Sequence, residues 1–445
     1  MELVDLIPTF GNTLYTIGAF VIALSVIVAV HEYGHYIVGR WTGIKADVFS
    51  LGFGPVLWSR PDKHGTVWQI AALPFGGYVK FMGDANAASA GAGEEFEEMD
   101  AETRRHTMHG APLWARSATV AAGPVFNFIL SVLVFAGFLI FQGIAANPLT
   151  IDELRPMPDP RSELAIGDEI LAIAGTPTPD VEQFNDFIDE LPQNPRLDYT
   201  LRRDGQQVSV SAPHPYPAIV SGLTPGSAAM DAGLSEGDVI LSVDGVQVAT
   251  FAELREIVGT SDGKPLLLEI WRNGTVTEVS LIPRRMDLPT SDGGFETRFL
   301  IGITGGLLFS PKTETPGVGA ALLYGANQTI FIVRSSLSGL YHMAAGAISR
   351  CNLRGPIGIA QTSGAAASQG LDSFIWFIAV LSTAVGLLNL FPIPVLDGGH
   401  LVFYAWEAVT GRPPSDGALR IMMTVGLTLI AMLMIFALTN DFLCP

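Results

Sequence analysis

The feature that most constrains this chain is a long apolar run at residues 22–30 that continues without a break into H-E-Y-G-H at residues 31–35. Ionisable residues inside a membrane-spanning helix are costly and are usually functional. On a helix, His31 and His35 lie one turn apart on one face, where both can bind a single metal ion. Glu32 lies beside them as a candidate base for water at that metal. Histidines buried in a soluble core are the alternative, and the apolar flank argues against it.

The composition is that of a membrane protein. The 445 residues are 49% hydrophobic and only 15% charged. A net charge of −18 argues against a nucleic-acid partner. Two cysteines, Cys351 and Cys444, are too few for a disulfide framework or a cysteine zinc site, and we expect unremarkable thiols. The N-terminal residues lack a basic stretch before the apolar run, so we expect no cleaved signal peptide.

Hydropathy predicts four membrane-spanning helices, at residues 12–40, 113–143, 372–408 and 418–438. Residues 317–348 are too polar for an ordinary span and predict an amphipathic helix on the membrane surface. In chain order, the predicted parts are the first transmembrane helix (1–45), a membrane-associated β-sheet with a cytoplasmic loop (46–112), the second transmembrane helix (113–145), two repeats (146–213 and 214–290), a linker with the amphipathic helix (291–370), the third transmembrane segment (371–410), and the fourth helix with the C-terminus (411–445).

Residues 46–81 are rich in Val, Phe, Trp and Tyr and are interrupted by Gly and Pro, which predicts short strands. Because the sheet is so apolar, we expect it to dip into the membrane interface. A small soluble hairpin module is the alternative. Residues 84–109 follow, and their acidic residues predict a solvated loop. Asn127, in the second span, either forms a hydrogen bond to a neighbouring helix or lines the candidate active site.

Residues 167–175 and 237–245 are two copies of one pattern, GDEILAIAG and GDVILSVDG. Turns at residues 203–205 and 272–274 recur at nearly the same offset and predict tight hairpins. The first copy is abbreviated at residues 158–166, so we expect its ligand groove to be incomplete.

The third span contains the run NLFPIPVLDGG at residues 389–399, whose prolines and glycines predict a broken helix. Such backbone survives in a membrane only where it lines a cavity or packs on protein. A carboxylate at this depth, Asp397, needs a cation or a proton. Zinc held by His31 and His35 needs a third protein ligand, and Asp397 completes that set with the fourth position left open.

Together, these motifs resemble those of the site-2 protease family of intramembrane zinc metalloproteases. The resemblance rests on residues 31–35, on Gly-Pro-x-x-Asn at residues 123–127 and on residues 389–399. The two repeats are similar to the tandem PDZ domains of its bacterial regulator-of-sigma-E protease branch. The resemblance implies a multi-span α-helical membrane protein with four transmembrane helices, a membrane-associated β-hairpin sheet and two tandem PDZ-like domains.

The resemblance also implies a Zn²⁺ endopeptidase that cleaves transmembrane segments of other membrane proteins in the lipid bilayer. The expected substrates are an anti-sigma factor after a first cleavage elsewhere, in envelope stress signalling, and remnant signal peptides. In this mechanism Glu32 moves the proton of water to the leaving amine. Asn389 either donates a hydrogen bond to the oxyanion or orders the broken helix.

Two other classes of protein have to be weighed. An ion-coupled transporter would use His, Glu and Asp as an ion path, but transporters have broken helices in two repeated halves. Here the repeat lies in the soluble part of the chain. A PDZ scaffold with an inactive metal site would not need Glu32.

Basic residues surround two loops, which the positive-inside rule places in the cytoplasm. In a bacterial inner membrane, the termini and repeats are then periplasmic, and the active site lies nearer to the cytoplasmic face. These residues are Arg40, Lys45, Arg60, Lys63, Lys80, Arg104, Arg105 and Arg116 in the first loop, and Arg412 and Arg420 in the second.

An extended substrate in lipid needs hydrogen-bond partners, which a strand edge supplies. We predict that residues 48–57 form this edge, with backbone N–H groups of residues 48–53 facing the substrate and residues 389–396 opposite. The predicted substrate-binding residues are Gly52, Phe53, Gly54, Asn389, Pro392 and Pro394.

Overall fold

The computed structural model describes residues 6–84, 96, 99–158, 163–180, 183–290 and 294–443. Its contacts divide the chain into two compact units. The first, which we call the membrane unit, contains Met1–Gly137, Gly319–Leu340 and Leu353–Pro445; the second, the repeat unit, contains Phe138–Val318 and Tyr341–Asn352. Cys444 and four acidic residues of the predicted loop at residues 84–109 lie outside the described residues; the four are Glu94, Glu95, Glu97 and Glu98.

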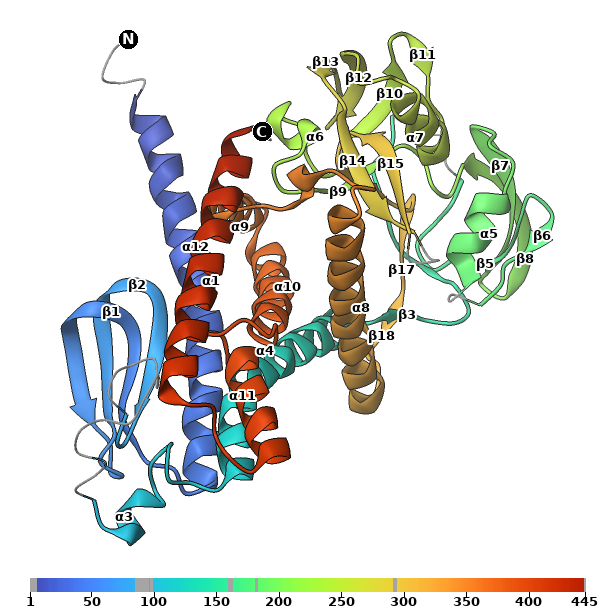
Figure 1. Ribbon diagram of the computed structural model, residues 1–445. Coiled ribbons are helices and arrows are strands. Elements are labelled where there is room, and N and C mark those ends of the chain that lie inside the picture. The colour runs from blue at the N-terminus through green and yellow to red at the C-terminus, as the bar shows by residue number, and fades with distance from the viewer. Residues whose placement is uncertain are drawn as a thin grey trace. The chain divides into compact units, whose positions relative to one another are not determined.

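Helices dominate the membrane unit (Figure 1). Four helices in the described part of the chain are long and apolar enough to cross a membrane, as predicted. The helices with their apolar stretches are α1 (Leu6–Trp41) with Thr13–Trp41, α4 (Leu113–Gln142) over its whole length, α10 (Leu371–Asn389) over its whole length, and α12 (Asp416–Leu443) with Gly417–Leu443.

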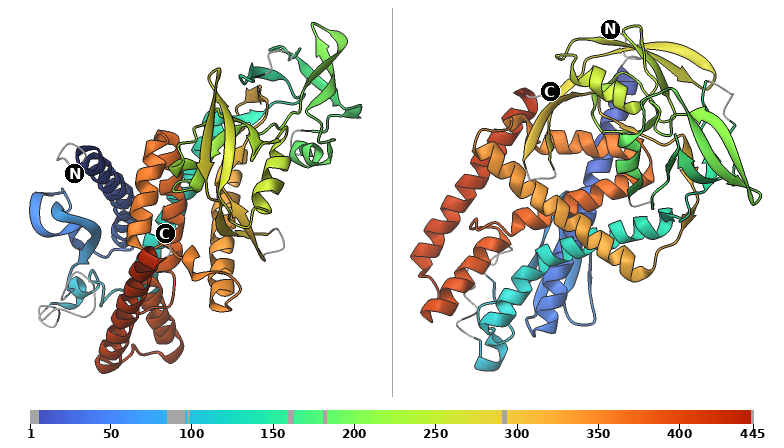
Figure 2. Two further views of the ribbon diagram at one scale, coloured as in Figure 1. Left: turned by 90° about the horizontal axis from the view of Figure 1, so that it is seen from above. Right: turned by 90° about the vertical axis from the view of Figure 1, so that its right-hand side faces the viewer.

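Two of the later helices, α9 (Pro356–Ser368) and α10, pack against α1 (Figure 2). Where the prolines predict a break, α10 ends at Asn389 and α11 (Asp397–Thr410) begins at Asp397. The predicted third segment at residues 371–410 is therefore two helices joined by a short non-helical stretch. A further short helix, α3 (Ala101–Arg104), lies in the loop before α4.

The helix predicted at residues 317–348 is α8 (Val318–Ala344). Its small residues Ala321, Gly325 and Thr329 are buried. A Cβ added to Gly325 would clash with the carbonyl oxygen of Val132 in α4, so glycine permits the close approach of these two helices. Its placement on a membrane surface remains a prediction.

The predicted β-sheet is a long, bent hairpin of β1 (Ala46–Pro61) and β2 (Val67–Phe81) beside α1 (Figure 1). The first part of β1, residues 46–51, pairs with residues 77–81 on one side and with residues 67–70 on the other. This part of β1 is therefore a central strand, with both of its sides occupied.

The predicted free edge at residues 48–57 is thus wrong for residues 48–51, which are paired on both sides. Gly52 and Gly54 have φ angles of 90° and 82°, which bend β1 back on its own partner strand. A Cβ on Gly52 would lie 2.8 Å from the carbonyl oxygen of Leu73, so the close approach that glycine permits is to the hairpin itself. The outer segments of the sheet are residues 56–61 and 77–81.

The repeat unit contains two four-stranded antiparallel sheets with matching strand order, β6-β5-β7-β8 and β11-β10-β12-β13. Asp204 and Asn273 adopt φ angles of 50° and 48° before glycine, which confirms the two predicted hairpin turns. The elements are β5 (Glu169–Ile173), β6 (Thr176–Pro177), α5 (Phe184–Glu190), β7 (Arg196–Arg203) and β8 (Gln206–Pro213), and then β10 (Val239–Val243), β11 (Val246–Gln247), α7 (Phe251–Gly259), β12 (Leu266–Arg272) and β13 (Thr275–Leu281).

Each sheet has a two-stranded ribbon beside it, and the ribbons show that the repeats are nested. The first ribbon pairs β4 (Ile151–Leu154) with β17 (Phe309–Pro311), and Phe309 is buried in the core of the first repeat. The second pairs β9 (Val220–Leu223) with β16 (Ile303–Gly305). The predicted boundary at residue 290 is therefore too early, because the strands that complete both repeats follow it. The remaining elements are β3 (Ile144–Ala145), α6 (Ala228–Asp231), β14 (Arg284–Pro289), β15 (Phe295–Leu300), β18 (Thr313–Glu314) and the 3₁₀ helix η3 (Arg350–Asn352).

Cys351, in η3, is disulfide-bonded, so the expectation of an unremarkable thiol is wrong for this residue. The backbone around it is held by Asp287 of the same unit, whose carboxylate accepts from the Ser349 N–H and the Asn352 amide. Disulfides persist mainly in oxidising compartments.

Candidate metal centre and active site

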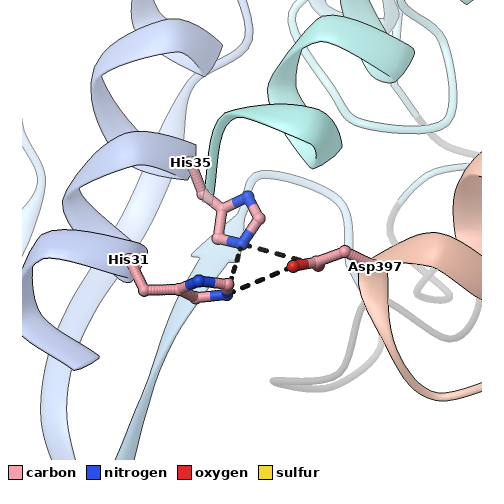
Figure 3. A group of neighbouring side chains, drawn as sticks. All are labelled: His31, His35 and Asp397. Carbon is pink, nitrogen blue, oxygen red and sulfur yellow. Dashed lines mark hydrogen bonds and ion pairs between the residues drawn. The ribbon is translucent and has the colours of Figure 1, made fainter. Parts of the chain in front are cut away.

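Three predicted metal ligands come together in the membrane unit (Figure 3). α1 presents His31 and His35 on one face, and Asp397 faces them from the first turn of α11. The Nε2 atom of His31 lies 3.2 Å from Nε2 of His35 and 3.2 Å from Oδ2 of Asp397. The Nε2 atom of His35 lies 3.5 Å from Oδ1 of Asp397.

The hydrogen bond on the far side of His35 fixes which ring nitrogen carries the proton. Its Nδ1 lies 2.9 Å from the backbone carbonyl oxygen of Thr119, which can only accept. The neutral ring therefore has its proton on Nδ1 and a lone pair on Nε2. That lone pair faces the carboxylate of Asp397, an arrangement that a cation stabilises.

The spacing of these atoms fits zinc. Ligand atoms bound to one tetrahedral zinc at about 2.0–2.1 Å lie roughly 3.3 Å from one another. The two Nε2 atoms lie 3.2 Å apart, and they lie 3.2 Å from Oδ2 (His31) and 3.5 Å from Oδ1 (His35) of the Asp397 carboxylate. Two imidazoles and one carboxylate also form a common donor set of catalytic zinc sites, which leave a position open for water.

One face of α4 forms the wall behind both histidines. A Cβ added to Gly123 would lie 2.6 Å from Cε1 of His35 and 2.8 Å from Cε1 of His31, so glycine makes room for the two rings. The side-chain amide nitrogen of Asn127 lies 3.2 Å from Nδ1 of His31. The Gly-Pro-x-x-Asn motif was visible in the sequence, but its contact with both ligands was not.

A cavity of about 230 Å³ opens beside the metal ligands. Glu32 and Asn389 lie on its wall, as their predicted catalytic roles require. His400 also lines the cavity and is not one of the three candidate ligands. The lining residues are His31, Glu32, His35, Gly77, Tyr78, Val79, Phe81, Met108, Val120, Asn389, Val395, Leu396, Asp397, His400 and Tyr404.

The end of β2 is the part of the sheet that reaches this cavity. A Cβ on Gly77 would lie 3.0 Å from Cγ of Glu32, so glycine lets the strand lie directly on α1. The backbone N–H of Val79 is directed at the Glu32 carboxylate, and that of Phe81 donates to Asp84 over 3.2 Å. Since alternate residues of a strand face one side, the N–H groups of residues 77, 79 and 81 face away from β1.

Five predicted substrate-binding residues do not line this cavity among the described residues: Gly52, Phe53, Gly54, Pro392 and Pro394. Phe53 instead stacks on Tyr78, with ring centroids 6.0 Å apart, and covers Gly76. The signal that sequence reasoning missed was the Gly76-Gly77 pair, which allows β2 to pass between Phe53 and α1.

A metal-ligand triad with an adjacent glutamate, in which two ligands and the glutamate lie on a membrane-length helix, is typical of an intramembrane metalloprotease. The chain matches the family description "Peptidase family M50" over residues 19–433. It therefore belongs to peptidase family M50, the site-2 proteases, and is a zinc metalloprotease. This membership does not favour the transporter or the inactive scaffold.

Relatives from several bacteria are similar over their full length. A Rhizobium meliloti protein named as a candidate zinc metalloprotease is 36% identical, over 97% of each chain. A Brucella suis protein with the same kind of name is 34% identical, again over 97% of each chain. The regulator of sigma-E protease RseP of Salmonella typhimurium is 33% identical over 97% of this chain and 99% of its own.

Proposed function

We propose that this chain hydrolyses peptide bonds within transmembrane segments of other membrane proteins, among them an anti-sigma factor already cut once elsewhere. The observation that carries the proposal is the convergence of His31, His35 and Asp397 beside Glu32 in one cavity. The substrate class draws on the Salmonella relative, whose name makes it a regulator of sigma-E.

In the mechanism, the chain's own residues position the substrate and move the proton. Zinc, when bound, supplies a Lewis acid that polarises the scissile carbonyl and acidifies water. Glu32, held by the Val79 N–H, accepts the proton of the attacking water and delivers it to the leaving amine. Asn389, at the end of α10 on the cavity wall, donates a hydrogen bond from its side-chain N–H to the developing oxyanion.

The outer edge of β2 holds the unwound substrate beside Glu32. A substrate helix must unwind before cleavage, because its peptide bonds are hydrogen-bonded within the helix. An extended peptide can then pair by β-augmentation with the outward N–H and C=O of Gly77 and with the outward C=O of Val79, whose N–H holds Glu32. Gly77 and Val79 take the place of residues 48–53 in this role, since both line the cavity.

Crosslinking can test the two outer edges of the sheet against each other. In a Glu32→Gln background, cysteine at Tyr78 should form a disulfide with a cysteine near the scissile bond of a model transmembrane substrate. The matched variant has cysteine at Trp58, on the opposite outer segment, and should not crosslink. Equal crosslinking at both positions would argue against the edge assignment.

Activity itself is tested with the purified full-length protein in detergent. It should contain one zinc per chain and cleave a model transmembrane peptide, and a chelator should abolish cleavage until zinc is restored. A protein that binds no zinc, or that cleaves equally well after zinc removal, would contradict the proposed function.

The orientation places the repeat unit and both termini in the periplasm, with the active site nearer to the cytoplasm. The basic loops support this placement. Cys351 belongs to the repeat unit and is disulfide-bonded, which supports the same side because periplasmic proteins keep disulfides. A reporter fused after Leu164 that is active only in the cytoplasm would contradict this orientation.

The nested repeats are PDZ-like domains that exclude substrates still carrying a bulky periplasmic domain. Their matching strand order and the helix in each support the PDZ assignment. Because the repeats are nested, a clean deletion has to remove residues 149–311 rather than stop near 290. That deletion should permit cleavage of longer substrates. Loss of cleavage of short substrates, with zinc retained, would favour a recruiting role instead.

A further inference from the structure

We propose that Asn127 is a positioning residue for the metal ligand His31, and that its side-chain oxygen accepts a hydrogen bond from Nδ1–H when the metal is bound. This inference rests on the zinc site of the proposed function. Asn127 is fully buried, its amide nitrogen lies 3.2 Å from Nδ1 of His31, and its Oδ1 has no hydrogen-bond partner.

The orientation of a side-chain amide follows from the group it meets, since its oxygen and nitrogen are nearly interchangeable in shape. A His31 ring that binds zinc through Nε2 carries its proton on Nδ1. That N–H needs an acceptor, and a half-turn of the Asn127 amide brings Oδ1 into this position. A ring without metal can carry its proton on Nε2 instead and donate it to Asp397, 3.2 Å away. In the structure, the NH₂ group of Asn127 faces Nδ1 of His31, which is the orientation expected for the ring without metal.

One face of α4 contacts the Nδ1 atom of both histidines. Thr119 and Asn127 lie eight residues apart, two turns along α4, with Gly123 midway. The carbonyl of Thr119 accepts from Nδ1 of His35, and the amide of Asn127 reaches Nδ1 of His31. α4 thus holds Nδ1 of each ring, while the two Nε2 atoms face Asp397.

The backbone at Asn127 is itself held in place. Its carbonyl oxygen accepts from the hydroxyl of Ser131 over 3.0 Å and from that of Ser382 in α10 over 2.9 Å. A Cβ at Gly386 of α10 would lie 3.2 Å from Cβ of Asn127, so the two helices are in close contact here. A side chain anchored in this way can orient a ligand without rearranging.

The test measures metal binding by the full-length protein in detergent, with zinc affinity from chelator competition and the visible spectrum of bound cobalt(II). Asn127→Leu should weaken zinc binding by about 10- to 100-fold and change the cobalt spectrum. Asn127→Asp keeps an acceptor at Nδ1 and should bind zinc at least as tightly as the wild type. Thr329→Val, which removes a buried hydroxyl hydrogen bond within α8, should leave zinc affinity unchanged.

Two results would overturn the inference. One is zinc affinity in Asn127→Leu equal to that of the wild type. The other is equal weakening in the Leu and Asp variants, which would assign Asn127 to helix packing alone. If the wild-type protein itself bound no zinc, the proposed function would fail instead, so the two failures are distinguishable.

Discussion

Buried aspartates are used differently in the two units of this protein. In the repeat unit, Asp168 and Asp238 are almost fully buried, and each is held by two nitrogens of one arginine at 2.6–2.7 Å. In the membrane unit, Asp397 faces the Nε2 atoms of two imidazoles, which lie 3.2 and 3.5 Å from its carboxylate oxygens. A carboxylate paired with a guanidinium is neutralised within the fold, whereas Asp397 still needs a cation.

The repeat unit applies this arrangement twice. Arg203 also donates to the carbonyl of Glu163, and Arg272 to the carbonyl of Gly233, so each arginine joins its aspartate to the preceding loop. Burial alone would raise the pKa of Asp168, but the hydrogen bonds from Arg203 and the Ala165 N–H, together with the charge of Arg203, lower that pKa. The comparison predicts that substitutions at Asp397 will change zinc binding and peptide cleavage. Substitutions in the aspartate–arginine pairs will instead change the stability of the repeats.

The largest effect is expected from Asp397→Ala. The substitution removes one of three metal ligands, so zinc binding and peptide cleavage should both be lost. Unfolding of the repeat unit, followed by hydrogen exchange, should be unchanged. Stoichiometric zinc in this variant would show that Asp397 is not a ligand.

Next comes Glu32→Gln, which separates chemistry from metal binding. An amide cannot accept the proton of water, so cleavage should fall by at least about 100-fold while zinc content stays at the wild-type level. Zinc analysis and peptide cleavage on the same preparation give both values. Cleavage at the wild-type rate would remove Glu32 from the mechanism.

Much of the metal centre could be predicted from sequence, because its signals are local. The spacing of His31 and His35 follows from the helical repeat, and the two prolines before Asp397 foretell a broken helix. The hairpin turns at Asp204 and Asn273 are equally local. In each case a few neighbouring residues determine the conformation.

The features that sequence reasoning missed depend on distant contacts. The bend of β1 depends on the close approach of Gly52 to the carbonyl of Leu73. The alternation of residues along a strand does not show which of its two edges is paired with another strand. The nesting of the repeats depends on β17 pairing with β4 across the whole second repeat. A glycine in a strand signals close approach, but it does not identify the partner.

A smaller effect is expected from Arg272→Met in the repeat unit. The variant leaves Asp238 buried without its charged partner and should lower the stability of the second repeat by about 2 kcal/mol. Arg202→Met is the matched control, because Arg202 is half-exposed in its pair with Glu169 and should change stability by less than about 1 kcal/mol. Hydrogen exchange in β12 and β13 measures the effect of Arg272→Met, and exchange in β5 and β7 measures that of Arg202→Met. Zinc content should not change in either variant. Equal effects of the two variants would contradict the role given to the buried pair.

The smallest effect concerns His214, the buried polar group at the junction of the two repeats. Its Nδ1 accepts from the Tyr216 N–H, and its Nε2 is buried without a partner in a small cavity lined also by Asp189 and Arg255. Burial lowers the pKa of His214, although the nearby Glu253 carboxylate acts in the opposite direction.

Because the unfolded chain takes up this proton first, stability of the junction should be greatest at neutral pH. It should decline as pH falls below about 6.5, by at most about 1.4 kcal/mol per pH unit. His214→Phe should flatten this dependence in hydrogen exchange of β8 and α7 between pH 7.5 and 5, whereas Phe at the exposed His64 of the membrane unit should leave it unchanged. An identical pH profile in His214→Phe and the wild type would show that the junction does not depend on a neutral imidazole.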